Sequence, residues 1–112
     1  MAGTIKRIGP LALTTTLTTN VYNQGSALIY DVIRHIHIAN KTALAATFTL
    51  YLGATGANAA GTELFLGRSV APNAEFEWYP AGLKMTSTDF LVGGAGTTTS
   101  LTITLTSEQY VV

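Results

Sequence analysis

Residues 28–40 read Leu28-Ile-Tyr-Asp-Val-Ile-Arg-His-Ile-His-Ile-Ala-Asn40, and the rest of the chain is organised around this segment. From position 32 onward the residues alternate as in a β-strand, where side chains two apart share a face. Strict alternation defines two faces, one with Val32, Arg34, Ile36 and Ile38 and the other with Ile33, His35 and His37. The segment is also rich in β-branched residues, which suit a pleated and half-buried surface. We therefore expect a central strand of a small antiparallel sandwich.

Several other segments also alternate with a period of two. Residues 100–106 do so most regularly, with threonine at every second position from 102 to 106. Residues 47–52 should place Phe48, Leu50 and Leu52 inward and Thr47, Thr49 and Tyr51 outward, and we expect them to form a hairpin with the central strand. Residues 75–79 place Phe76 and Trp78 on one face and Glu75, Glu77 and Tyr79 on the other.

Shorter strands are expected at residues 21–22, 62–66, 68–70, 83–85 and 90–92, with an exposed loop at 53–61 and turns at 40–42, 86–89 and 93–99. Helical periodicity is absent from the sequence. About eight short strands separated by frequent turn signals predict an all-β fold, an antiparallel β-sandwich of the jelly-roll or Ig-like kind.

The length of 112 residues suits one domain with a real core. We expect residues 20–112 to form the sandwich. Residues 1–19 fit either an edge strand or an extended arm that orders only against a neighbour. Gly9-Pro10 should break any regular element there.

The composition excludes several classes of function. Charged residues make up 11% of the chain, against roughly 25% in typical soluble domains. Six basic and six acidic residues cancel, so no electrostatic footprint for nucleic acid or for an anionic membrane is present. The chain has no cysteine, which excludes disulfides and thiolate chemistry. No segment approaches the roughly 18 apolar residues that span a bilayer, and no signal-peptide core is present, so we expect folding in a cytoplasm.

His35 and His37 are the residues that most resemble a metal site, because imidazoles at i and i+2 of a strand can share a zinc, iron or copper ion. A closed site needs further ligands. Asp31 falls on the same face under strict alternation, but roughly 13 Å from His35 along a strand, too far to share an ion. The glutamate that a cupin would place shortly afterwards is missing from residues 39–42. We therefore expect no metal and no cofactor, and interpret the pair as surface or interface histidines whose protonation would make assembly pH-sensitive.

Other candidate sites also favour a non-enzymatic interpretation. Glu75 and Glu77 have a spacing that could suit paired catalytic carboxylates, but a solvated strand face explains it better. The glycine-rich segments 53–56 and 93–96 precede no helix, so they do not fit a phosphate loop. An aromatic platform for sugars could be built from Trp78, Tyr79, Tyr51 and Tyr22. We favour the alternative, in which Trp78 belongs to the core and the tyrosines to the surface or an interface.

Four segments of the sequence carry a resemblance to a known family of proteins. They are residues 33–42, residues 47–60 with the run Leu-Gly-Ala-Thr-Gly-Ala-Asn-Ala-Ala, and the motifs Phe76-Glu-Trp-Tyr79 and Asp89-Phe-Leu-Val-Gly-Gly94. Over residues 20–106 the chain resembles the small β-sandwich virion proteins of tailed bacteriophages. The shared pattern is a strand that ends in an Asn-containing turn, a Leu-Tyr strand, a variable loop and a final alternating strand.

The resemblance implies a structural protein of the virion without catalytic residues: a capsid decoration (cement) protein, assembled in the host bacterial cytoplasm. We expect a homotrimer that binds the major capsid protein, with no nucleic-acid or membrane partner. A tail-associated protein that binds a tail protein is the close alternative, a receptor-binding or carbohydrate-binding sandwich the third and a cupin-like metalloenzyme the fourth. The expected interface residues are Lys6, Arg7, Leu11, Leu13, Leu17, His35, His37, Tyr51 and Tyr79.

Overall fold

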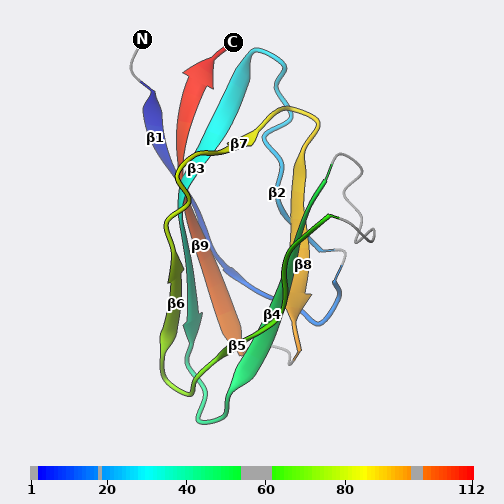
Figure 1. Ribbon diagram of the computed structural model, residues 1–112, viewed down its shortest axis with the longest axis vertical. Coiled ribbons are helices and arrows are strands. Elements are labelled where there is room, and N and C mark those ends of the chain that lie inside the picture. Colours follow the sequence, from blue (N-terminus) through cyan, green and yellow to red (C-terminus); the bar gives the residue numbers. More distant parts are fainter. Residues whose placement is uncertain (1–2, 18, 54–61, 97–99) are drawn as a thin grey trace.

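A computed structural model describes residues 3–17, 19–53, 62–96 and 100–112, and within these residues it contains nine strands and no helix. The strands form two sheets that face each other in an elongated molecule of 44 × 27 × 20 Å (Figure 1). The strands are β1 (Thr4–Ala12), β2 (Asn20–Tyr22), β3 (Ile29–Asn40), β4 (Ala46–Gly53), β5 (Glu63–Val70), β6 (Glu75–Trp78), β7 (Leu83–Met85), β8 (Phe90–Ala95) and β9 (Leu101–Val111).

The two sheets have a nested strand order. One sheet has the order β1-β9-β3-β6 with β7 also paired to β3, and the other has the order β2-β8-β4-β5. All strand pairs are antiparallel. The nested pairs are β1 with β9, β2 with β8, β3 with β6 and β7, and β4 with β5, and the pairs β3–β9 and β4–β8 join them within each sheet. Nested pairs folded into two sheets make a jelly roll. The predicted all-β sandwich is therefore confirmed, and its strand order is that of the jelly-roll alternative.

The predicted hairpin between the central strand and residues 47–52 is wrong. Strand β3 lies in the five-stranded sheet, whereas β4 lies in the four-stranded sheet and pairs with β5 and β8. Asn40 stands where the chain leaves β3. Its side-chain amide donates hydrogen bonds to the carbonyls of Leu44, Val70 and Ala71, and its Oδ1 accepts from Thr42. These bonds hold the turn that carries the chain from one sheet to the other.

A β-bulge in β3 changes which side chains face the core. Ile33 pairs with Ser107 of β9 and His35 pairs with Thr106, so Arg34 is an extra residue without a partner in this register. Ile33 is completely buried together with Ile36 and Ile38. The expected grouping of Ile33 with the histidines is therefore wrong, because a bulge shifts the alternation by one residue.

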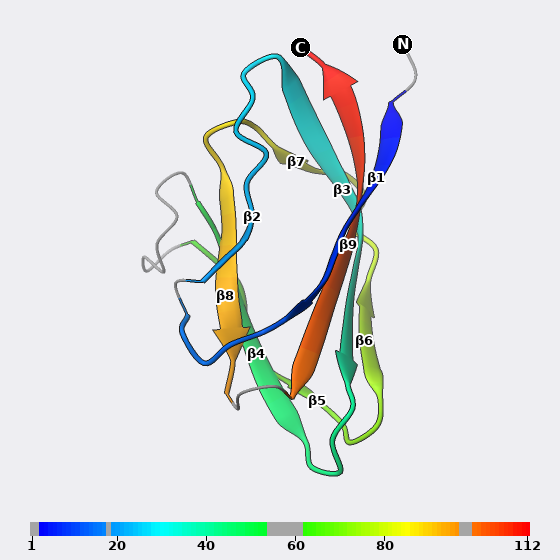
Figure 2. The same ribbon diagram turned by 180° about the vertical axis from the view of Figure 1, so that it is seen from behind.

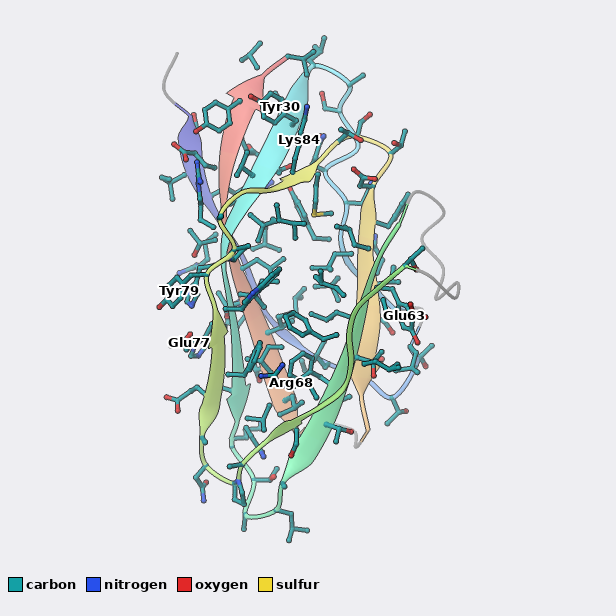
Figure 3. All side chains as sticks on the ribbon, in the orientation of Figure 1. Tyr30, Glu63, Arg68, Glu77, Tyr79 and Lys84 are labelled. Carbon is teal, nitrogen blue, oxygen red and sulfur yellow. The ribbon has the colours of Figure 1, made fainter. Side chains whose placement is uncertain are left out.

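The core between the sheets is apolar and is closed at one side by aromatic rings. Phe48 of β4 and Phe65 of β5 contact Phe76 of β6 at centroid distances of 5.1 and 5.3 Å, and Trp78 packs against Phe65 at 5.0 Å. The Arg68 guanidinium lies 5.0 Å from the Phe76 centroid (Figure 3). The predicted inward face of β6 is confirmed. The same core contains Ile8, Leu13, Val21, Tyr22, Ile33, Ile36, Ile38, Ala46, Leu50, Val70, Met85, Leu91, Ala95, Leu101, Ile103 and Leu105.

Gly93 and Gly94 lie inside β8 and not in the predicted turn. A β-carbon on Gly93 would stand 2.1 Å from the carbonyl oxygen of Thr49, and one on Gly94 would stand 2.3 Å from that of Thr14. Neighbouring backbone therefore approaches too closely for any side chain. Residues 54–61 of the predicted loop and 97–99 of the predicted turn lie outside the described residues.

The N-terminal segment belongs to the sandwich. Strand β1 pairs along β9, and Gly9-Pro10 does not end it but coincides with a register shift between Ile8 and Leu11. The chain then crosses to the smaller sheet (Figure 2), where the Thr14 carbonyl accepts a 2.7 Å hydrogen bond from the Ala95 N–H. Of the two alternatives for residues 1–19, the structure has an edge strand at 4–12.

Candidate functional site

A cluster of two imidazoles and one carboxylate lies on the outer face of the five-stranded sheet. His35 and His37 come from β3, and Glu77 comes from β6, directly opposite His37 in the strand register. Glu77 Oε1 lies 2.7 Å from His35 Nε2 and 2.7 Å from His37 Nδ1. In Figure 3 Glu77 and Tyr79 lie at the margin of the molecule, away from the packed interior. We call these three residues the His–His–Glu cluster.

The bulge at Arg34 and the aromatic ring of Tyr79 position this cluster. The bulge allows the buried Ile33 and the outward-facing His35 to be only two residues apart. Tyr79 stacks on the His35 ring with a centroid distance of 4.4 Å and an interplanar angle of 8°. Two ordered strands and one stacked ring therefore set the directions in which the ligand atoms point.

The carboxylate of the cluster is held in its ionised form. Hydrogen bonds from His37 first and His35 second lower the pKa of Glu77 below its ordinary value. Each ring nitrogen that faces the carboxylate then acts as an N–H donor, which assigns the Nε2–H tautomer to neutral His35 and the Nδ1–H tautomer to neutral His37. The side chains of His35, His37 and Glu77 are 24%, 32% and 43% exposed, so solutes reach them.

The cluster has the donor set of a metal site. The ligand atoms of His35, His37 and Glu77 all lie within 4.8 Å of one another, and imidazole and carboxylate are common ligands of zinc and related ions. The two histidines are recognisable from the sequence, where Glu77 stands out only as a neighbour of Glu75. Glu77 lies 40 positions from His37, and only the pairing of β3 with β6 brings them together.

A shallow depression of about 320 Å³ adjoins His37 on the same side of the molecule, and its other lining residues include Lys41, Asn73 and Glu75. A second depression, of about 350 Å³, lies at the opposite end of β3 between Tyr30, Lys84 and the C-terminal valines. There Lys84 Nζ stands 4.6 Å from the Tyr30 ring centroid (Figure 3).

Asp31 belongs to a buried hydrogen-bond network and not to the histidine face, where strict alternation had placed it. It is completely buried and accepts hydrogen bonds from Tyr22 Oη at 3.0 Å and from Ser107 Oγ at 2.6 Å. Gln109 Nε2 donates to Tyr22 Oη at 3.2 Å. Burial, followed by the neighbouring Asp31 carboxylate, raises the pKa of Tyr22 to about 12. This network ties β2 of one sheet to β3 and β9 of the other.

The expected interface residues divide into exposed and buried groups. Lys6, Arg7 and Leu11 are exposed on β1, and Tyr79 is 70% exposed. Leu13 and Tyr51 are only 2% and 7% exposed within this chain, so they are not available as surface contacts. Their inclusion was wrong: Leu13 packs into the core as the chain crosses between sheets, and Tyr51 lies within the ladders of β4 with β5 and β8. Leu17 is partly buried.

The proposed sugar platform does not form from the four aromatic residues considered. Trp78 packs against the core, as the favoured alternative predicts. Tyr22 and Tyr51 are buried, so their expected surface position is wrong. Tyr79 alone among the four is largely exposed, and its ring is stacked on His35.

Exposed apolar side chains are a surface feature that strand alternation alone does not reveal. Ile5 on the edge strand β1 is 65% exposed, and similar exposure is found at Leu28, Leu44, Leu66, Val111 and Val112.

No protein-family model matches this chain, and no curated protein matches it either. Within the residues that the structure describes, no helix is long and apolar enough to cross a membrane.

Proposed function

We propose that this protein is a structural, non-enzymatic attachment module, a decoration (cement) protein that binds the capsid of a tailed bacteriophage. The observation that carries the proposal is the edge strand β1. It pairs with β9 on one side, and its other edge pairs with no strand in the described part of the chain. An exposed edge offers backbone N–H and C=O groups to a strand of a partner, which is a common mode of protein attachment.

The side chains of β1 suit such a contact. Ile5 and Arg7 pair with Glu108 and Thr106 and share the outer face of the sheet. Lys6 points the other way, with its Nζ 5.5 Å from the ring centroid of Tyr22. Ile5 is 65% and Leu11 42% exposed, so both contribute apolar area that a partner would bury. Because Lys6 points away from the outer face, the basic group that β1 presents on that face is Arg7, and it would suit an acidic patch on the capsid.

The jelly-roll order gives further support. Jelly rolls with two packed sheets are used by viral capsid proteins, lectins and cupins. This argument is an analogy at the level of the fold, since the same fold serves unrelated functions. The outward direction of His35 and His37 counts against the cupin-like alternative, because the imidazoles do not face the space between the sheets.

The test uses charge substitutions on the edge strand. We expect Ile5→Glu together with Leu11→Glu to weaken cosedimentation with purified phage heads by about tenfold or more, because burying two unpaired carboxylates costs several kcal/mol. Leu44→Glu is the matched control, since Leu44 is 77% exposed in the loop before β4. Equal binding of both variants would remove β1 from the attachment surface.

Copy number separates the head from the tail. A decoration protein is present in hundreds of copies per virion and a tail component in far fewer, so quantitative gel analysis of purified particles distinguishes them. The proposed homotrimer is a C₃ assembly, and light scattering on the purified protein measures its mass directly. A monomer at all accessible concentrations would contradict the trimer while leaving capsid attachment open to the cosedimentation assay.

A further inference from the structure

We propose that His35, His37 and Glu77 bind a divalent first-row transition-metal ion, with Zn²⁺ as the probe ion. This inference goes beyond the proposed attachment function and does not depend on it. The cluster lies on β3 and β6, at the end of the sheet order β1-β9-β3-β6 opposite to β1. If the protein failed to bind capsids, the metal-site proposal would therefore still stand, and if zinc failed to bind, the attachment proposal would still stand.

The three ligand atoms already lie close together. Glu77 Oε1 is 2.7 Å from each of the two ring nitrogens, and the three donor atoms lie within 4.8 Å of one another. Zinc bonds to nitrogen and oxygen are about 2.0–2.2 Å long, so ligand atoms of a tetrahedral site are about 3.3 Å apart. To admit the ion, the Glu77 carboxylate has to withdraw by about half an ångström from each ring, and the two ring nitrogens have to come well within the 4.8 Å that bounds the cluster, since two zinc–nitrogen bonds span about 4.2 Å at most.

The three side chains of the cluster differ in how freely they can move to admit the ion. Glu77 is the most exposed of the three side chains at 43%, and its terminal torsion is soft. The His35 ring is held by the stacked Tyr79 ring, and His37 sits opposite Glu77 in the strand ladder. The adjustment is therefore a rotation of side chains, with the greatest freedom at Glu77.

The chemistry of the donors selects the class of ion. Imidazole nitrogen favours zinc, copper, nickel and iron over magnesium and calcium, which prefer oxygen ligands alone. Neutral imidazole binds through a nitrogen without a proton. In the metal-free cluster that proton lies on the nitrogen that donates to Glu77, and binding moves it to the other nitrogen of the same ring. Two neutral imidazoles and one carboxylate leave one positive charge on the bound complex.

Three protein ligands leave a coordination position open. The cluster is accessible from solvent, and the depression of about 320 Å³ lined by His37, Lys41, Asn73 and Glu75 adjoins it. A water molecule or a small external donor completes the coordination there, as at other zinc sites with three protein ligands. The site therefore differs from a closed structural site that folding depends on.

The experiment titrates the intact chain with ZnCl₂ by isothermal calorimetry after treatment with a chelator. We expect one ion per chain, with affinity reduced by about tenfold or more in each of His35→Ala, His37→Ala and Glu77→Gln, because each change removes one of three ligands. Glu63→Gln is the control: Glu63 is an exposed carboxylate on β5 of the other sheet, so its replacement should change affinity by less than about twofold.

A second measurement needs no variant. The chain has only two histidines, so every imidazole signal in a nitrogen-edited NMR spectrum belongs to the cluster. Zinc should shift the signals of Nε2 in His35 and of Nδ1 in His37. The proposal is overturned if zinc leaves these signals unchanged, if His37→Ala binds as well as the wild type, or if Glu63→Gln and Glu77→Gln weaken binding equally.

Discussion

Replacing Asp31 by alanine should destabilise the protein by about 2–4 kcal/mol. The carboxylate is completely buried and accepts hydrogen bonds from Tyr22 Oη and Ser107 Oγ. Alanine leaves both hydroxyl groups buried without their acceptor, and each such loss costs about 1–3 kcal/mol. The two losses add incompletely, because Tyr22 Oη keeps its contact with Gln109 Nε2.

The assay is urea unfolding followed by tryptophan fluorescence. Trp78 is the single tryptophan of the chain and packs against Phe65 at 5.0 Å, so its emission reports on closure of the sandwich. An exposed strand carboxylate such as Glu75 provides the control, whose replacement by alanine should change the unfolding free energy by less than about 0.5 kcal/mol. Adding Ser107→Ala to Asp31→Ala should cost less than the sum of the two single changes, since donor and acceptor are then both absent.

The result that would refute this reasoning is equally specific. If β3 had no bulge, unbroken alternation would place Asp31 on the outer face with His35. Asp31→Ala would then resemble the exposed control and change stability by less than about 0.5 kcal/mol. A value in that range would contradict both the buried network and the register shift at Arg34.

Three further substitutions test other parts of the fold. Gly94→Ala should cost about 1–3 kcal/mol in urea unfolding, because its β-carbon would stand 2.3 Å from the Thr14 carbonyl oxygen, whereas Gly82→Ala, with open space around it, should be close to neutral. Tyr22 has a pKa of about 12 in the folded protein against about 10 when unfolded, so its stabilising effect is complete below pH 10 and is lost as the pH rises toward 12. Between these pH values the Tyr22→Phe variant should therefore lose less unfolding free energy than the wild type. An equal loss would contradict the raised pKa of Tyr22. Asn40→Ala should cost about 2–4 kcal/mol, measured as a lower urea midpoint at unchanged slope, because three backbone carbonyls lose their donor.

Local patterns were sufficient for the class of fold and for several faces. The alternation of Phe76 with Glu77 and Trp78 predicts correctly which side of β6 enters the core. The turn at residues 86–89 also forms, with the Thr86 N–H donating to the Asp89 carboxylate at 2.8 Å. These features are predictable because they depend on residues that are neighbours in the chain. A period of two and a capping carboxylate act over a few residues.

The candidate site was only half predictable. His35 and His37 are two residues apart, and a strand places both on one face whatever the rest of the chain does. Glu77 joins them because β6 pairs with β3 in one particular register, and no local pattern in the sequence predicts that pairing. The surface role expected for Leu13 and Tyr51 failed for a similar reason. Leu13 is buried by packing into the core between the sheets, and Tyr51 lies between β5 and β8, which its own strand meets only through pairing distant in the sequence.

The amino-acid sequence alone therefore determined that this chain forms strands, that they are amphipathic, and that a single apolar core holds them together. The tertiary structure decided how the strands are paired, and with it the bulge at Arg34, the crossing of the chain between sheets at Asn40 and the burial of Gly93 and Gly94 inside β8. The physical reason is that strand hydrogen bonds join residues distant in the sequence. A shift of one residue in that pairing exchanges inside for outside while leaving every local preference satisfied.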